Sequence, residues 1–138
     1  MKRKYYFVIL FFILAIFLSG CSGITTPILE VNQEEKVKET VTNYWSAMSN
    51  SQYELAKTYC MSYGYFYGLA FAGQNATYYN YVTAVFTPVI NWVEINGNKA
   101  TVKANLIMDT NIGSITLYDY TMGLIKIGSA WKLEEQLI

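Results

Sequence analysis

The sequence contains no histidine among its 138 residues, and this absence excludes several classes of enzyme. Hydrolases built on a Ser-His-Asp or Cys-His arrangement need an imidazole as their general base. Nearly all catalytic zinc sites also use histidine ligands. The sequence shows no paired metal-ligand spacing, no glycine-rich phosphate loop and no nucleophile elbow. We therefore expect no metal and no cofactor.

Cysteine is also scarce, and one of the two cysteines follows a distinctive N-terminal pattern. Residues 2–4 are all basic, and Tyr5–Leu18 carries no charge. An apolar run of this length suits a signal peptide and is too short for an ordinary membrane span. The small residues Ser19 and Gly20 then precede Cys21. This arrangement resembles the lipobox of bacterial lipoproteins.

The resemblance implies that residues 1–20 are a signal peptide that is removed, and that Cys21 becomes a lipidated first residue. The alternative is an uncleaved signal anchor with an incidental cysteine. A lipid on Cys21 would hold the protein at a cell membrane or an outer membrane, with its domain outside the cytoplasm. With Cys21 used in this way, Cys60 cannot form an intrachain disulfide, and we expect it on the buried side of a helix.

Basic residues are too few for a protein that binds nucleic acid. The whole chain has ten basic and ten acidic residues. Removal of the three basic residues at positions 2–4 leaves seven against ten, a net charge of −3. Nucleic acids require a basic footprint on the protein. We expect no nucleic-acid partner, and we expect the lipid rather than electrostatic attraction to attach the protein to its membrane.

The rest of the chain has a length that suits one domain. We expect a tether at residues 21–31 and the domain at residues 32–138. Asn32 and Glu35 have the spacing of a capping box, which predicts the start of a helix. Apolar residues then follow at helical spacing: Val37, Val41, Tyr44, Trp45 and Met48.

Ser51 and Glu54 repeat the capping-box spacing and predict a second helix, which would form a hairpin with the first. Its apolar side would consist of Tyr53, Ala56, Tyr59 and Cys60. Residues 61–81 are uncharged, rich in aromatic side chains and interrupted by glycine. For this stretch we expect a loop and a third helical segment near residues 75–84.

After Pro88 the apolar residues alternate with a period of two, which predicts strands. Asn96-Gly97 is a strong hairpin signal. The next strand and the last one should each bury one face: Ala100, Val102, Ala104, Leu106 and Met108 in the former, Trp131, Leu133 and Leu137 in the latter. Between them we expect a strand over Ile115–Ile127 with a bulge near Gly123. Helices followed by an antiparallel meander predict an α+β fold, with the helices on one face of a curved sheet.

Four segments carry a resemblance to a known superfamily: residues 37–48, the sequence Tyr53-Glu54-Leu55-Ala56, residues 93–102 and residues 128–133. They are similar to the nuclear transport factor 2-like (SnoaL-like, cystatin-like) proteins, and in particular to small bacterial lipoproteins of unknown function. The resemblance implies a cone in which a bent sheet wraps the helices and leaves a pocket at its open end. Members include isomerases, dehydratases and cyclases as well as non-catalytic binding modules, so the fold does not settle the function.

An isomerase-like site in such a pocket would need a carboxylate as base and a tyrosine or protonated acid as oxyanion donor. Asp119 and Asp109 are the weak candidates for the base. The strand phase favours a solvated position for Asp119. Asp109 lies at a strand end, where a cap for the following turn is the better interpretation.

The aromatic residues divide into expected core residues and candidates for binding. We expect Tyr44, Trp45, Tyr59 and Trp92 to fill the cone. The uncharged segment at residues 61–81 has more aromatic side chains than one short helix can bury, and tyrosine combines a broad contact area with a polar tip. The candidates for ligand or partner binding are Tyr63, Tyr65, Tyr67, Tyr78 and Tyr79.

The sequence as a whole favours a lipid-anchored module of the cell envelope that is non-catalytic and binds a small apolar ligand or a partner protein. The alternative is an enzyme similar to ketosteroid isomerase or a dehydratase, which would use a pocket carboxylate and tyrosines. The sequence leaves open which ligand or partner is bound, which membrane carries the protein, and whether the chain forms a homodimer.

Overall fold

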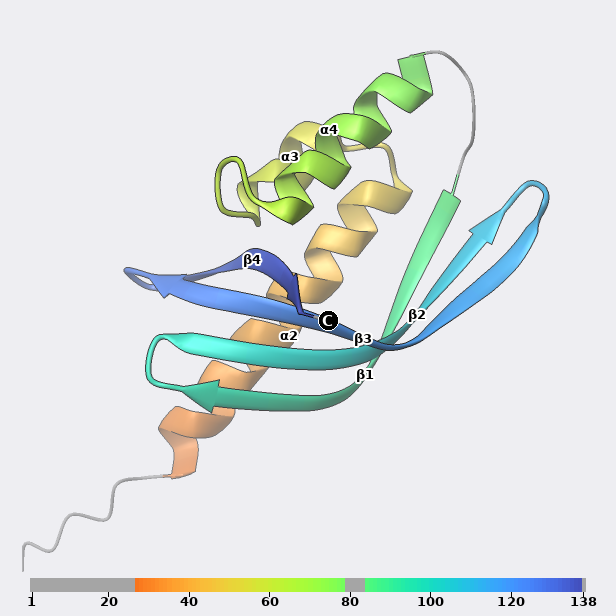
Figure 1. Ribbon diagram of the computed structural model, residues 1–138. Coiled ribbons are helices and arrows are strands. Elements are labelled where there is room, and N and C mark those ends of the chain that lie inside the picture. Colours follow the sequence, from red (N-terminus) through yellow and green to blue (C-terminus); the bar gives the residue numbers. More distant parts are fainter. Residues whose placement is uncertain (1–26, 79–83, 138) are drawn as a thin grey trace, which may run out of the picture.

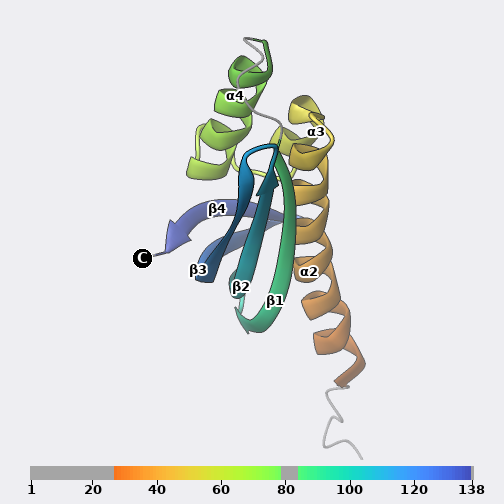
Figure 2. The same cartoon turned by 90° about the vertical axis from the view of Figure 1, so that its right-hand side faces the viewer.

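The computed structural model describes residues 27–78 and 84–137, which form three helices followed by four strands. The helices are α2 (Pro27–Ser49), α3 (Tyr53–Thr58) and α4 (Tyr65–Tyr78). The strands are β1 (Ala84–Asn96), β2 (Lys99–Thr110), β3 (Gly113–Ile127) and β4 (Ala130–Leu137). They pair antiparallel in the order β1-β2-β3-β4, a simple meander. The sheet is strongly curved and the helices lie on one side of it (Figures 1 and 2), which confirms the predicted α+β architecture.

The first helix is longer than the sequence pattern indicates. It begins at Pro27 rather than at Asn32, so Asn32 lies inside the helix and cannot cap it. Proline favours the first position of a helix, because its fixed φ is already helical and its missing N–H would have no intrahelical acceptor. A salt bridge between Glu34 and Lys38 at 2.5 Å adds support about two turns further on. The remainder of the predicted tether, residues 21–26, lies outside the described residues, as does Cys21.

The buried stripe of α2 is confirmed. Val37, Val41, Tyr44, Trp45 and Met48 are all buried. They face the inner side of the sheet, where Ala100, Val102, Ala104 and Leu106 of β2 are buried as predicted. Met108, one step further along the same face, is only half-buried. The core therefore lies between α2 and the middle of the sheet.

The second helix forms without the predicted cap. Ser51 has a left-handed φ of 57°, and the residue at the N-cap position is Gln52, whose side chain makes no capping hydrogen bond. Ala56 and Cys60 are buried, whereas Tyr53 and Tyr59 are half-buried beside the core. The connection after α3 joins the sheet, because Met61 N–H donates to Leu133 O and Leu133 N–H donates to Tyr59 O, both at 2.8 Å.

The third helix starts ten residues before the position expected from the sequence, at Tyr65 instead of near residue 75. Phe66 and Ala70, one turn apart, are buried, and they give α4 the inward face that stabilises it. Gly73 inside this helix has a packing reason. A β-carbon there would lie 2.6 Å from the ring of Tyr53, so a larger residue would force that ring to shift.

Irregularities in the sheet decide which side chains face outward. The β1–β2 register shifts between Ile90 and Trp92, and the extra residue reverses the phase of the strand. Trp92 is consequently 44% exposed, with Lys103 Nζ 5.5 Å from its ring centroid. The assignment of Trp92 to the core was therefore wrong. The predicted irregularity at Gly123 is present as a register shift between Gly123 and Leu124.

Candidate functional site

The space between the helices and the sheet is occupied by aromatic rings. Tyr44, Trp45, Phe66 and Tyr120 pack edge to face, with ring centroids 4.9 to 6.5 Å apart. All four are buried. Among the described residues, no charged side chain is buried beside them. The described interior therefore has hydrogen-bond donors but no carboxylate.

The hydroxyl groups in this cluster are neutral donors. Tyr44 donates a 2.8 Å hydrogen bond to the carbonyl oxygen of Phe66. Burial raises the pKa of Tyr44, and burial together with a hydrogen bond to Tyr65 raises the pKa of Tyr120. Trp45 Nε1 is buried without a partner among the described residues. These groups could orient a ligand, but none of them is a base at neutral pH.

The two weak candidates for a catalytic base both lie at the surface. Asp119 is exposed at a third irregularity of the sheet, with a left-handed φ of 52° and its N–H donating to Asn105 Oδ1 at 3.2 Å. Asp109 is exposed near the end of β2. The turn that follows is capped by Thr110, whose Oγ1 accepts from Ile112 N–H at 3.3 Å and donates to Gly113 O at 2.8 Å.

Some of the aromatic side chains in residues 61–81 are exposed to solvent. Tyr63 is 94% exposed, Tyr65 is 45% exposed, and Tyr67 is half-buried. The ring centroids of Tyr63 and Tyr67 lie 5.9 Å apart. The side chain of Tyr78 and all of Tyr79 lie outside the described residues. Phe71, one turn beyond Tyr67, is 54% exposed and was not among the sequence candidates. Tyr63 lies in the turn just before α4, with a left-handed φ of 64°, and together with Tyr67 and Phe71 of the helix it forms what we call the aromatic flank of α4.

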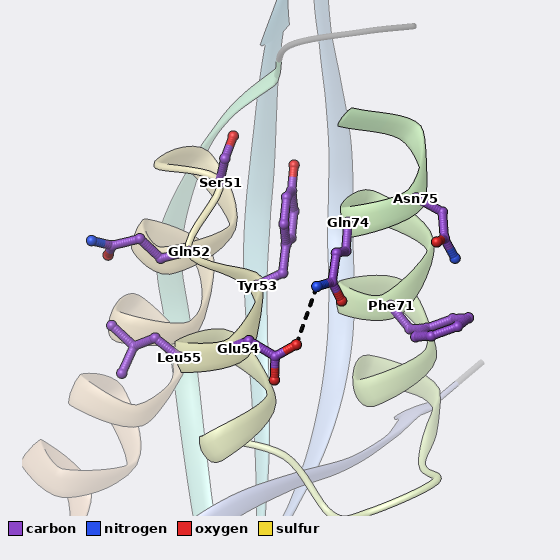
Figure 3. Close-up of a pocket in the computed structure, with 8 residues that line it drawn as sticks. All are labelled: Ser51, Gln52, Tyr53, Glu54, Leu55, Phe71, Gln74 and Asn75. Carbon is purple, nitrogen blue, oxygen red and sulfur yellow. Dashed lines mark hydrogen bonds between the residues drawn. The ribbon is translucent and has the colours of Figure 1, made fainter. Parts of the chain in front are cut away.

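A depression of about 750 Å³ lies beside this flank, where α3 and α4 meet. It is lined by residues from both helices: Ser51, Gln52, Tyr53, Glu54, Leu55, Phe71, Gln74 and Asn75. Figure 3 shows the ring of Tyr53 standing between the two helices and Gln74 reaching across to Glu54. Phe71 and Asn75 project from one flank of α4, and Gln52 and Leu55 project on the opposite side. We call this depression the α3–α4 groove.

Lys57 holds the two helices of the groove together. Its ammonium group donates to Glu54 Oε1 at 2.8 Å and to Gln74 Oε1 at 2.9 Å, and Gln74 Nε2 donates to Glu54 Oε1 at 3.2 Å. The same nitrogen lies 5.6 Å from the ring centroids of both Tyr67 and Phe71. The Lys57 side chain is only 11% exposed. Its hydrogen bond holds the pKa of Glu54 below the usual range, with help from Gln74.

Sequence reasoning could have found only part of this network. Glu54 and Lys57 have the spacing of neighbours on a helix surface, which is visible in the sequence. Gln74 lies on another helix, and no local pattern places it beside them. Phe71 was visible as one aromatic residue among many, and only the observed course of α4 puts it next to Lys57.

A smaller depression of about 300 Å³ lies between α2, the end of α3 and the β3–β4 turn. Its charged residues are Lys36, Glu39 and Lys132, and Trp131 and Tyr59 supply rings. Lys132 is already engaged, because its ammonium group donates to the carbonyl oxygen of Thr58 at the end of α3. Within the described residues, no group of histidine, cysteine or acidic side chains could hold a metal ion.

Two further findings concern Cys60 and the membrane. Cys60 is buried, as predicted, but it lies just after α3 in a β-bridge with Leu133 and not on a helix. Burial raises the pKa of its thiol to about 12. Among the helices of the described ranges, none combines the length and the apolar character needed to cross a bilayer.

Comparison with known proteins gives matches in structure alone. No family model and no curated protein matches the sequence. Rv3472, a protein of unknown function from Mycobacterium tuberculosis, superposes with a TM-score of 0.64 at 16% identity, over 83% of this chain and 75% of that one. A protein of unknown function with a cystatin-like fold from Nostoc punctiforme gives a TM-score of 0.56 at 11% identity, over 75% and 86% of the two chains.

A further match has a name that includes NTF2, the abbreviation of nuclear transport factor 2. Its TM-score is 0.55 at 10% identity, and the match covers 75% of this chain and 96% of that one. Identities this low establish similarity of fold and carry no activity from one protein to another. The chain therefore has the cystatin-like, nuclear transport factor 2-like fold that the sequence resemblance implied.

Proposed function

We propose that this chain is a non-catalytic binding module of the cell envelope, anchored by a lipid on Cys21, and that it binds its ligand or partner through the aromatic flank of α4. The observation that carries the proposal is the exposure of Tyr63 and Phe71, at 94% and 54%, on a flank whose remaining ring, Tyr67, is fixed by Lys57. Exposed rings on a rigid support lose little conformational entropy when they bind.

The contents of the cone also support a non-catalytic role. An isomerase or dehydratase of this fold needs a carboxylate within reach of a tyrosine donor. The buried tyrosines Tyr44 and Tyr120 have no such neighbour in the described interior, and Asp109 and Asp119 are exposed on the sheet. We therefore place binding at the surface of α4 rather than inside the cone.

The proposed anchor rests on the N-terminal pattern of the sequence. Three basic residues, an uncharged run, two small residues and Cys21 occur in the order that lipoprotein signals require. An anchor of two or more acyl chains would be stable, since each buried CH2 contributes about 0.8 kcal/mol. The domain itself then needs no basic surface for membrane attachment.

Site-specific photo-crosslinking in cells tests the binding surface. Benzoylphenylalanine is introduced in place of Phe71 in one strain and in place of Tyr118 in a control strain. Tyr118 is a suitable control because it is 75% exposed but lies on β3. We expect a discrete crosslinked product at position 71 and none at position 118. Equal products at both positions, or no product at position 71, would refute binding through this flank.

A further inference from the structure

The smaller depression, beside α2, contains two opposite charges that do not pair with each other. Lys36 and Glu39 both line it, three residues apart on the helix. Side chains at this spacing are neighbours, but a lysine that precedes an acid pairs less well than the reverse order. Glu34 and Lys38, in the favourable order, form an ion pair on the same helix. Neither Lys36 nor Glu39 has an ion-pair partner in the described part of the chain, and both are exposed.

The two walls of the depression bring polar groups to one space. Lys36, Thr40 and Asn43 follow one another at helical spacing, so their side chains leave α2 on the same side. The facing wall consists of the end of α3 and the β3–β4 turn, which contribute Tyr59 and Lys132. A ligand that lies along this side of α2 therefore meets groups from both walls.

The charges in the lining are two cations and one anion. The ammonium group of Lys132 donates to the carbonyl oxygen of Thr58, and an ammonium group has three donors, so further hydrogen bonds remain open to it. Glu39 is the one carboxylate of the lining. A simple anion would leave Glu39 beside a like charge, and a simple cation would meet two lysines. A ligand with both a carboxylate and an ammonium group pairs with all three side chains.

The apolar part of the depression is formed by two rings. Trp131 is 3% exposed, its indole N–H donates to Gln33 Oε1 at 3.2 Å, and Lys126 Nζ lies 5.9 Å from its ring centroid. Tyr59 is half-buried and adds the second ring. Such rings offer apolar contact to a hydrocarbon side chain. The volume of about 300 Å³ lies at the lower limit of small-molecule sites, so the ligand must be small.

We infer that this depression binds a free α-amino acid with an apolar side chain. Its carboxylate would pair with Lys36 and Lys132, and its ammonium group would pair with Glu39. Its side chain would lie against the rings of Tyr59 and Trp131. An α-amino acid carries both charged groups on one carbon atom, which suits partners that are neighbours on a helix surface. The site is separate from the aromatic flank of α4, so the inference goes beyond the proposed function and does not depend on it.

The experiment is a titration of the full chain, purified in a nonionic detergent, with L-leucine and with L-phenylalanine. Isothermal titration calorimetry gives the affinity, and amide NMR signals of the lining residues give the location. We expect at least one of the two amino acids to bind. Its analogues without the ammonium group or without the carboxylate, which for leucine are 4-methylpentanoate and 3-methylbutylamine, should bind at least about tenfold more weakly. Each analogue loses a hydrogen bond between charged groups.

Four variants assign the two charges. Lys36→Met and Glu39→Gln should each weaken binding at least about tenfold, because each removes one charged partner. Lys36→Arg keeps the positive charge and should keep the affinity within about threefold. Glu35→Gln, exposed on α2 but outside the lining, is the matched control and should bind like the wild type. All these positions are exposed, so melting temperatures within about two degrees of wild type should show that each variant is folded.

The outcomes bear on this site alone. Failure of both amino acids to bind would overturn the inference. Equal affinity for the amino acid and for either analogue would also overturn it, because one of the two charged groups would then take no part in recognition. Lys36→Met or Glu39→Gln with the affinity of the wild type would have the same consequence. The crosslink at position 71 reports on the aromatic flank of α4, so the proposed function can fail or stand independently of these results.

Discussion

Gly64 lies so close to the backbone of β4 that a β-carbon at this position would stand 2.8 Å from the carbonyl oxygen of Glu134. The contact joins the start of α4 to the last strand, and it cannot relax by moving a flexible side chain, because the clashing atom belongs to the backbone. Together with the hydrogen bonds around Leu133, it fixes α4 and its aromatic flank relative to the sheet.

We predict that Gly64→Ala destabilises the protein by about 1–3 kcal/mol, the usual cost of forcing an extra carbon into a packed site. The matched control is Gly68→Ala in α4, where a β-carbon would meet nothing within 4 Å. Alanine is favoured over glycine inside a helix, so the control should gain about 0.5–1 kcal/mol. Urea denaturation of both variants measures the difference. Equal stability of the two would contradict the close approach.

The two tryptophans Trp45 and Trp92 should respond very differently to truncation. Trp45 is 2% exposed and contacts four aromatic rings, so Trp45→Ala should cost about 3–5 kcal/mol of unfolding free energy. Trp92 is 44% exposed, and Trp92→Ala should cost less than about 1 kcal/mol. Thermal melts followed by circular dichroism distinguish them. A melting temperature of the Trp45 variant within a degree or two of wild type would show that the ring cluster is not the core.

The thiol of Cys60 should be inert in the folded protein. Burial raises its pKa to about 12, so the folded state keeps it protonated at neutral pH, and a thiol reacts poorly in that form. In Cys21→Ser, which leaves Cys60 as the only cysteine, we expect no alkylation by iodoacetamide at neutral pH and complete alkylation in denaturant, measured by mass spectrometry. Rapid alkylation without denaturant would place this thiol at the surface.

The same pKa shift gives a pH dependence. The pKa of Cys60 is higher in the folded state than the ordinary value near 8.5 of an unfolded thiol. Its contribution to stability is therefore fully present below about pH 8.5 and is lost as the pH rises toward 12. Cys60→Ala should lose less stability than wild type between about pH 8.5 and pH 10.5 in urea titrations. If the free energy of unfolding falls equally with pH in the two proteins, ionisation of Cys60 is not the cause of the loss.

The anchor can be tested independently of the fold. We expect metabolic labelling with a fatty acid to mark the wild type and to miss Cys21→Ser, because serine has no thiol to receive the diacylglyceryl group. The variant should keep the same circular dichroism spectrum, since every buried residue named above lies after position 36. Equal labelling of the wild type and Cys21→Ser would contradict the lipoprotein hypothesis.

Patterns that repeat along one element predicted their part of the fold correctly. The stripe from Val37 to Met48 and the alternation from Ala100 to Leu106 each report which face is buried, because periodicity reflects contact with the core. The start of α2 was misplaced because two start signals compete, Pro27 and the Asn32–Glu35 spacing, and the sequence does not rank them.

Features that depend on a partner element could not be predicted. The exposure of Trp92 follows from one extra residue opposite β2, and nothing near Ile90 signals this bulge. The course of α4 depends on the burial of Phe66 and Ala70 against the core, which outweighs the low helix propensity of its two glycines. The α3–α4 groove could not be predicted either, because it lies between α3 and an α4 that starts at Tyr65 rather than near residue 75.

The length of α2 has a mechanical meaning if the proposed anchor is present. Its 23 residues make a rod of about 35 Å, and α3 and α4 stand at the end opposite to Pro27 (Figure 1). In an anchored chain, α2 would thus act as a spacer that holds the aromatic flank away from the lipid headgroups. Ligands fixed in a layer at that height would therefore be met more often than ligands at the membrane surface.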